Sequence, residues 1–288
     1  MKRIAITTDS NSGITQETAQ ALGISVLPMP FVMDGEIYYE NITLSQEAFY
    51  EKLMGDAAIS TSAPSVQEVT ELWDILLQTH DEVVHIPMSA GLSSSCQMAQ
   101  ALALEYEGKV QVVDNKRISV TQKQSVLDAM AMAEAGCDAA AIRQTLEAEA
   151  LHASIYIMVD TMQYLKKGGR VTPVAAMIGT VLNIKPVLQI QGERLDAFAR
   201  VKGVKQAKRT MIDAMKKDFD MRFAADVAAG KMSLWVAYTY DETAAEAFRQ
   251  EVMEAFPGID VQMDPLSLSV SCHIGPGALA IASARKAD

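Results

Sequence analysis

Short apolar runs alternate with helical periodicity along the first half of the chain. Residues 3–8 and 82–87 form compact apolar runs, while residues 119–135 have the length and spacing of a helix. This alternation is typical of a parallel sheet covered by helices. We therefore expect strands over 3–8, 25–32, 37–40, 82–87 and 110–114, and helices over 15–22, 46–53, 66–78, 93–107, 119–135 and 138–149.

The pattern changes in the second half. Apolar runs at 186–190 and 194–201 flank Gln191 and Gly192, which predicts a hairpin, and a basic amphipathic helix is expected over 204–217. Hairpins mixed with helices indicate a mixed or antiparallel sheet. Further strands are expected over 155–159, 233–240, 261–263, 268–272 and 278–283, and further helices over 173–182 and 242–256.

The break between these patterns predicts a two-domain α/β protein. A chain of 288 residues is longer than one core usually needs, so two moderate domains are expected. We place an N-terminal parallel α/β domain at 1–150 and a C-terminal mixed-sheet α/β domain at 151–288.

The amino-acid composition limits the kinds of binding partner that we expect. Hydrophobic residues make up 49% of the chain and charged residues 21%, which is typical of an ordered globular protein. The net charge of -11 disfavours general attraction to nucleic acids or anionic lipid surfaces, so we expect no nucleic-acid partner. Without an apolar window of about 20 residues, no integral membrane association is expected.

Cysteine usage favours a reducing compartment. Cys96, Cys137 and Cys272 are odd in number and widely spaced, so neither a disulfide framework nor a metal site is predicted. The apolar stretch at residues 4–6 is too short for a signal peptide. These features predict a cytoplasmic protein.

The stretch 164–173, Tyr-Leu-Lys-Lys-Gly-Gly-Arg-Val-Thr-Pro, carries the densest candidate chemistry. Thr172 can cap a helix with Pro173 at its first position, and the paired glycines allow a close backbone approach just before it. Lys166, Lys167 and Arg170 add positive charge to an acidic chain. The stretch is suited to an anion, although a tight turn with solvated lysines is the simpler reading.

Two hydroxyl clusters precede helices at expected sheet edges. One is Ser60-Thr61-Ser62-Ala63-Pro64-Ser65, and the other is Ser93-Ser94-Ser95. Ligands of open α/β sheets bind at such edges, where helix N-termini favour a phosphate or carboxylate. Helix capping explains both clusters equally well.

Two further polar groups follow strands. His273 precedes Gly275-Pro276-Gly277, where glycines permit close approach to a ligand, and Asp9 ends the first strand. A structural histidine and a capping aspartate are the competing interpretations. No dinucleotide, phosphate-loop or hydrolase-elbow fingerprint occurs, so those classes lack their usual support.

Taken in order, the motifs resemble the DegV family of bacterial fatty-acid-binding proteins. They are Thr8-Asp9-Ser10, Thr61-Ser62-Ala63-Pro64-Ser65, Ser89-x-x-Leu92-Ser93, Val113-Asp114, the 164–170 stretch, Asn183-Ile184-Lys185-Pro186 and His273-Ile274-Gly275-Pro276-Gly277. The resemblance runs from residue 8 to about 280. It implies two α/β domains with an apolar ligand tunnel between them that holds one long-chain fatty acid.

The resemblance also implies a role and a site. The protein would be no enzyme itself and would need no cofactor; it would present the acyl chain to a fatty acid kinase, whose acyl phosphate serves phospholipid synthesis. Thr61, Ser93 and His273 match the carboxylate-binding positions, with Ser62 as an addition. Arg170 matches an arginine associated with phosphoryl transfer.

The chain departs from the family pattern, and two other functions remain open. Ser94-Ser95 replaces Gly-Thr, Ala63 replaces glutamine, and Asn115 and residues 121–124 replace a serine followed by glycines.

One alternative function is an acyl hydrolase or transferase with Ser93 as nucleophile and His273 as base. The other is a phosphosugar- or nucleotide-binding regulator that uses Arg170.

Overall fold

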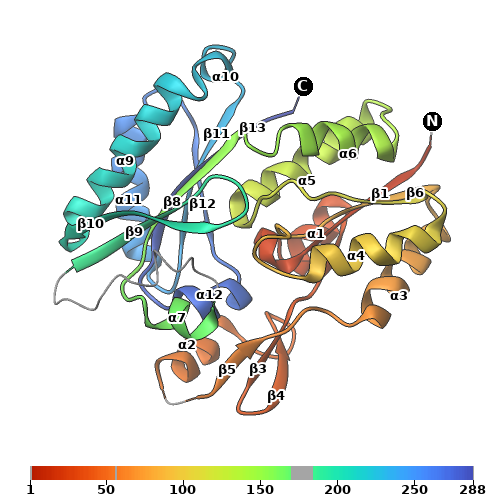
Figure 1. Ribbon diagram of the computed structural model, residues 1–288, viewed down its shortest axis with the longest axis horizontal. Helices are drawn as coiled ribbons and strands as arrows, with labels where there is room; N and C mark the ends of the chain where they lie inside the picture. Colours follow the sequence, from red (N-terminus) through yellow and green to blue (C-terminus); the bar gives the residue numbers. More distant parts are fainter. Residues whose placement is uncertain (1, 56, 170–183, 288) are drawn as a thin grey trace.

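A parallel sheet with helices on both faces forms the centre of the N-terminal half (Figure 1). The computed structural model describes residues 2–55, 57–169 and 184–287. Helices α1, α5 and α6 cover one face, and α3 and α4 cover the other. The strands in sheet order are β2 (Ser25–Leu27), β1 (Ile4–Asp9), β6 (Glu82–Ile86) and β7 (Val110–Val112). The helices are α1 (Gln16–Leu22), α3 (Val66–Leu77), α4 (Ser95–Ala103), α5 (Ser119–Glu134) and α6 (Ala139–Ala148).

A six-stranded mixed sheet forms the centre of the C-terminal half. Its neighbours pair antiparallel except β11 and β12, which are parallel. Helices α9 and α11 pack on one face, and α5 lies on the other (Figure 1). In sheet order the strands are β10 (Leu195–Lys202), β9 (Ile184–Ile190), β8 (Ala153–Met158), β13 (Leu279–Arg285), β11 (Met232–Tyr238) and β12 (Val261–Pro265). The helices are α7 (Gln163–Gly168), α9 (Gly203–Met221), α10 (Ala224–Ala228), α11 (Glu242–Ala255) and α12 (Leu268–Ile274).

A small antiparallel sheet links the two halves. Its order is β4 (Glu36–Tyr39), β3 (Pro30–Met33) and β5 (Ile59–Thr61), and α2 (Gln46–Met54) packs against it. Phe31 and Phe49 lie in one cluster with Leu268 of α12, so this N-terminal segment packs on a C-terminal helix. The segment lies at the bottom of Figure 1, below α7 and α12.

The single strand expected over 25–32 is wrong. The structure divides it into β2, which joins the parallel sheet, and β3, which joins the small sheet. Pro28 falls between them, and a proline has no N–H group to continue a ladder. The short strand β5 was not expected, because the sequence of residues 59–61 suggested only a hydroxyl cluster before a helix.

The strand expected over 268–272 is also wrong, because these residues form α12. The side chain of Ser267 accepts a hydrogen bond from the Val270 N–H, and the Glu40 carboxylate accepts one from the Leu268 N–H at 2.9 Å. These two groups satisfy free N–H groups at the start of the helix. A short apolar run does not by itself distinguish a strand from a buried helix, whereas Ser267 was a readable cap.

Most other expected elements are present within a few residues. The hairpin over 186–201 is β9 and β10, and the basic amphipathic helix is α9. The helix expected over 93–107 begins only at Ser95 and ends in a 3-10 turn over Leu104–Tyr106, which leaves Ser93 in the preceding loop. The helix expected over 173–182 lies outside the described residues.

Candidate functional site

A cavity lies between the carboxyl edge of the parallel sheet and one face of the mixed sheet. Its empty volume is about 1040 Å³, including the part open to solvent. The mixed sheet contributes apolar side chains and the loops after the parallel strands contribute polar ones. The apolar lining includes Ile155, Ile157, Leu195, Ala237, Ala280 and Ala282.

Thr61 and His273 meet at the polar end of this cavity. Thr61 Oγ1 and His273 Nε2 lie 2.9 Å apart, although the residues are 212 positions apart in the chain. Thr61 ends β5 and His273 lies in the last turn of α12, so the packing of the small sheet on α12 creates the pair. A hydroxyl beside an imidazole offers donors to an oxygen-bearing ligand.

Ser62 and Ser93 line the same cavity. Ser93 Oγ accepts a hydrogen bond from the Ser95 N–H at 3.2 Å. That contact uses an oxygen lone pair, so the hydroxyl hydrogen stays available for a ligand oxygen. Ser94, the N-cap of α4, also lines the cavity and makes no capping bond with its side chain. The four expected site residues therefore face one cavity, while their role as carboxylate ligands stays a prediction.

Glycines allow the two helices near His273 to pack closely. A Cβ atom added at Gly168, the last residue of α7, would lie 2.1 Å from His273 Nδ1. One added at Gly275 would lie 2.3 Å from the Tyr164 ring. The first glycine of the 164–173 stretch thus admits the histidine of the other motif. Arg170, Thr172 and Pro173 lie outside the described residues.

Asp9 is fully buried and holds neighbouring loops together. Its carboxylate accepts hydrogen bonds from the Met88 N–H at 2.8 Å, the Asn11 N–H at 3.0 Å and Gln122 Nε2 at 3.1 Å. Burial raises the pKa of Asp9, and these donors oppose that rise. The competing interpretation, a cap for the helix region at Thr15, holds only for the preceding turn: Asp9 caps the 3-10 turn Ser10–Ser12, whereas Thr15 caps α1.

The tip of the β9–β10 hairpin meets the loop that carries Ser93. Glu193 pairs with Lys116 at 2.9 Å, and a Cβ atom at Gly91 would lie 2.3 Å from the Glu193 carbonyl oxygen. Ile190 and Leu195, on either side of the tip, line the cavity. The hairpin therefore forms part of the cavity wall and joins the two halves of the molecule, a contact that the sequence did not indicate.

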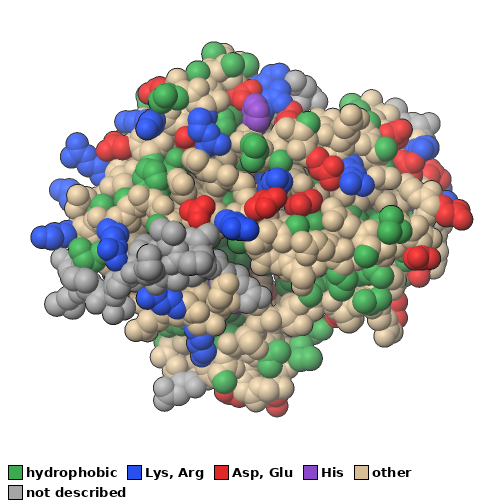
Figure 2. All heavy atoms as spheres, in the orientation of Figure 1, with side chains coloured by type: hydrophobic (Ala, Val, Ile, Leu, Met, Phe, Trp, Pro, Cys, Tyr) green, Lys and Arg blue, Asp and Glu red, His purple; other side chains and the backbone are tan. Residues whose placement is uncertain are grey.

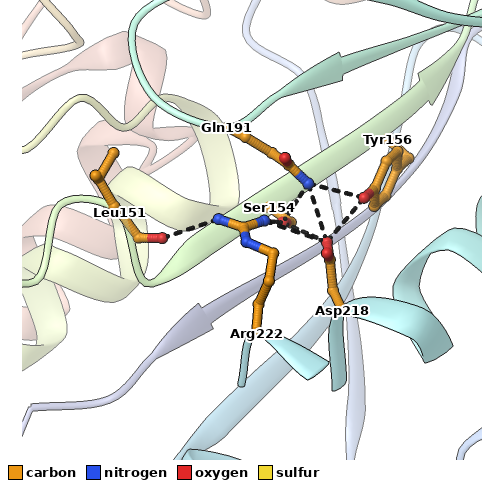
Figure 3. A network of polar contacts seen from close by, with 6 residues as sticks. All are labelled: Leu151, Ser154, Tyr156, Gln191, Asp218 and Arg222. Atoms are coloured by element: carbon orange, nitrogen blue, oxygen red, sulfur yellow. Dashed lines mark hydrogen bonds and ion pairs between the residues drawn. The ribbon is translucent and has the colours of Figure 1, made fainter. Parts of the chain in front are cut away.

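A polar network holds this hairpin in place (Figure 3). Gln191 Nε2 donates to Asp218 Oδ2, to the Tyr156 hydroxyl and to Ser154 Oγ at 2.8–3.2 Å. Ser154 and Tyr156 also donate to Asp218, and Arg222 NH1 lies 2.7 Å from Ser154 Oγ. The buried Asp218 carboxylate is thereby satisfied, and the side chain at the start of the turn is tied to α9.

The molecular surface is unevenly charged. Lys and Arg side chains gather on the side of α9 and β10, whereas acidic side chains are frequent on the side of the parallel sheet (Figure 2). In the three described ranges, no His, Cys, Asp or Glu side chains form a group suited to a metal ion. No helix within those ranges has the length and apolar character needed to cross a bilayer.

Comparison with known proteins gives consistent matches along nearly the whole chain. A family model described as "Uncharacterised protein, DegV family" matches residues 3–286. A DegV domain-containing protein of Deinococcus radiodurans is 32% identical over 280 residues, which is 97% of each chain.

Two solved structures share the fold and are described as fatty-acid binders. A DegV family protein from Thermus thermophilus, described by its fatty acid binding, superposes with a TM-score of 0.88 at 29% identity and covers 98% of this chain and 99% of its own. DegV from Bacillus subtilis, described as a fatty acid binding protein, gives 0.84 at 25% identity over 99% and 100% of the two chains.

Proposed function

Because this chain belongs to the DegV family, and the cavity described above joins a polar end to an apolar wall, we propose that it binds one long-chain fatty acid. The observation that carries the proposal is the Thr61–His273 pair, which stands in the same cavity as Ser62, Ser93 and an apolar sheet face. The descriptions of the Thermus and Bacillus proteins support the choice of ligand.

The polar end suits a carboxylate. The hydroxyls of Thr61 and Ser93 can donate to its two oxygens without a metal ion, with His273 Nε2 as the partner of the Thr61 hydroxyl. Ser62, whose hydroxyl donates to the Ala63 carbonyl oxygen in this structure, can join them by rotating its side chain. A carboxylate left without donors in such a site would be strongly unfavourable. The head group therefore fixes the orientation of the ligand.

The apolar wall supplies most of the affinity. Burying an acyl chain releases about 0.8 kcal/mol per methylene, or on the order of 10 kcal/mol for a long chain. Part of this offsets the loss of freedom on binding, and the remainder is enough for tight binding. The hydrolase alternative is weaker, because Asp9, its candidate orienting acid, directs its carboxylate to Met88, Asn11 and Gln122.

The test combines ligand identification with two substitutions. Native mass spectrometry of the purified protein should find a fatty acid bound to the chain. Thr61→Val and Ser93→Ala should each weaken the binding of a fluorescent fatty acid by about 1 to 3 kcal/mol, because each leaves a buried charged acceptor short of one donor.

Ser65→Ala is the matched control for both substitutions. Ser65 belongs to the same hydroxyl cluster but caps α3 and does not line the cavity. Its replacement should lower stability and leave the affinity unchanged. If Thr61→Val and Ser93→Ala behave like the control, the two hydroxyls do not bind the carboxylate.

We also infer presentation of the bound acid to a fatty acid kinase, which the family resemblance implies. Arg170 is the residue that the resemblance links to phosphoryl transfer, and this expectation rests on the sequence alone. Arg170→Ala should leave fatty acid affinity nearly intact and reduce acyl phosphate formation with a cognate kinase, because a guanidinium acts where phosphate charge is neutralised. An equal loss in both assays would remove the separate phosphoryl role.

A further inference from the structure

The tip of the β9–β10 hairpin and two loops of the N-terminal half meet in a close contact. A Cβ atom at Gly91 would lie 2.3 Å from the Glu193 carbonyl oxygen, so residue 91 has no room for a side chain. The Glu193 carboxylate also pairs with Lys116 Nζ at 2.9 Å, on the loop that precedes α5. This contact of Glu193 with Gly91 and Lys116, the seam, joins the two halves of the molecule.

The seam lies in the wall of the cavity. Leu92 follows Gly91 and lines the cavity, as do Ile190 and Leu195 on either side of the hairpin tip. Gly91 and Glu193 are both exposed to solvent. The seam therefore has the cavity on one side and solvent on the other.

The two attachments of the hairpin tip differ in strength. Gln191 donates a hydrogen bond to the buried Asp218 carboxylate, which fixes the tip to the C-terminal half (Figure 3). The ion pair across the seam is exposed instead, since the Lys116 side chain is 36% and the Glu193 side chain 47% exposed. Exposed ion pairs are screened by water and contribute little to stability. The seam is thus the weaker attachment, and we expect the wall to part there.

An opening at the seam suits an acyl chain. It would separate Leu92 from Ile190 and Leu195, which gives both edges of the opening apolar side chains. A chain that crosses apolar edges keeps its methylenes out of water during the passage. Ser93, one of the expected carboxylate-binding residues, follows Leu92 directly, so the opening leads to the polar end of the cavity.

We propose that the seam is the portal through which the fatty acid enters and leaves the cavity, and that the Lys116–Glu193 ion pair is its latch. This inference rests on the proposed function and adds the route of the ligand. None of the three seam residues lines the cavity, so a weaker latch favours the open state of the free and the loaded protein alike. Entry and release should then accelerate by the same factor, and the dissociation constant should stay unchanged.

The experiment measures both rates by stopped-flow fluorescence after removal of co-purified lipid. The ligand is a conjugated polyene fatty acid, which fluoresces without an attached dye, and excess hexadecanoate displaces it in the release measurement. Glu193→Lys places two positive charges at the seam and should raise both rates about 2-fold to 5-fold, the range for one exposed ion pair. The dissociation constant, taken from an equilibrium titration, should not change.

Two further variants separate the ion pair from the substitution itself. Lys116→Glu combined with Glu193→Lys exchanges the charges and should bring both rates back toward the wild-type values. Asp114 and Arg194 lie beside the exchanged charges, so the restoration should be partial. Glu251→Lys is the matched control, because the Glu251 side chain is 49% exposed, pairs with a lysine at 3.0 Å and does not line the cavity. It should leave both rates unchanged.

Gly91→Ala opens the seam by size instead of charge. Gly91 does not have a positive φ that would strain an alanine, so the main obstacle to the added Cβ atom is the Glu193 backbone. The resulting displacement of the tip should raise both rates. Gly55→Ala is the control, since Gly55 has a φ of -86°, its added Cβ atom would find its nearest neighbours at 3.5 Å, and the residue does not line the cavity.

Three results would overturn the proposal. Unchanged rates in both Glu193→Lys and Gly91→Ala would mean that the fatty acid passes elsewhere. A faster release with an equal loss of affinity, which the charge exchange does not reverse, would make the seam a part of the binding wall and no portal. If the wild type binds neither the polyene acid nor hexadecanoate, the proposed function falls and the portal with it, and this outcome is distinct from the other two.

Discussion

The two faces of the six-stranded sheet are built from the same strands and serve different ends. On β13, Leu279 and Ile281 face α9 and α11, while Ala280 and Ala282 face the cavity. The packed face carries large side chains such as Tyr156, and it meets the aromatic rings of Phe219 in α9 and Phe248 in α11. The cavity face places alanines at its centre and borders a volume that the described residues do not fill.

This difference shows how one strand can support both folding and binding. Side chains alternate between faces with a period of two, so each face can be composed independently. Large side chains fill the packed face to the density of a protein interior. Small apolar side chains on the other face keep that surface apolar while leaving room for a ligand. The packed face should therefore govern stability and the cavity face affinity.

The largest expected effect comes from opening a space in the packed face. Ile281 is fully buried there, so Ile281→Ala should lower the free energy of unfolding by about 2 to 5 kcal/mol, through lost burial and the void left behind. Urea denaturation checks the value. Fatty acid affinity of the folded variant should stay close to that of the wild type, and a parallel loss of affinity would show that the two faces are not independent.

The next effect concerns the helix that closes the cavity face. Burial raises the pKa of Glu40 to about 7, and the hydrogen bond from the Leu268 N–H at the start of α12 opposes that rise. The folded protein therefore holds this proton more tightly than the unfolded chain, whose glutamate titrates near 4.5. The stability contributed by Glu40 is complete below pH 4.5 and is lost as the pH rises through 7.

Glu40→Gln isolates this effect, because an amide oxygen can still accept from Leu268. As the pH rises from 4.5 to 7, the free energy of unfolding of the wild type should fall by about 2 kcal/mol relative to that of the variant, after allowance for the partial exposure of Glu40. Denaturant titrations of both proteins across the pH series measure the difference. Parallel pH profiles would show that Glu40 titrates normally.

Much of the fold was readable from the sequence because its long elements have clear periodicity. The parallel strands, α5, the β9–β10 hairpin and α9 follow from apolar spacing and turn residues alone. The failures at 25–32 and 268–272 share a cause. Both are short apolar runs whose secondary structure depends on tertiary partners. The partner is the small sheet in one case, and Glu40 together with the cluster of Phe31 and Phe49 in the other.

The candidate site was predictable at motifs and not elsewhere. Thr61, Ser62, Ser93 and His273 stood out as hydroxyls and a histidine beside helix starts and glycines, and the structure places all four in one cavity. Asn11, Ser119 and Ser269 also line the cavity and gave no such signal, because an isolated polar residue in a loop or helix is ordinary. The alanines of β13 gave no indication of the cavity either, because the alternation of side chains along a strand identifies an apolar face but not whether the space above that face is filled.

The smallest expected effect tests that space directly. Ala280→Leu adds bulk where Ala280 lines the cavity, so it should displace about two methylenes of the ligand and weaken long-chain binding by ~1.5 kcal/mol, or about tenfold. Its effect on stability should be small, because the added side chain enters existing room. Ala207→Leu is the counterpart on the packed face, where Ala207 is fully buried among α9 and sheet residues, and overpacking there should cost about 1 to 3 kcal/mol of stability without altering affinity. Calorimetric titration gives the change in fatty acid affinity of each variant, and urea denaturation gives the change in its free energy of unfolding. The proposed division of roles between the two faces is wrong if Ala280→Leu destabilises the protein as strongly as Ala207→Leu does and leaves long-chain affinity unchanged. In that case the acyl chain does not use the space above Ala280.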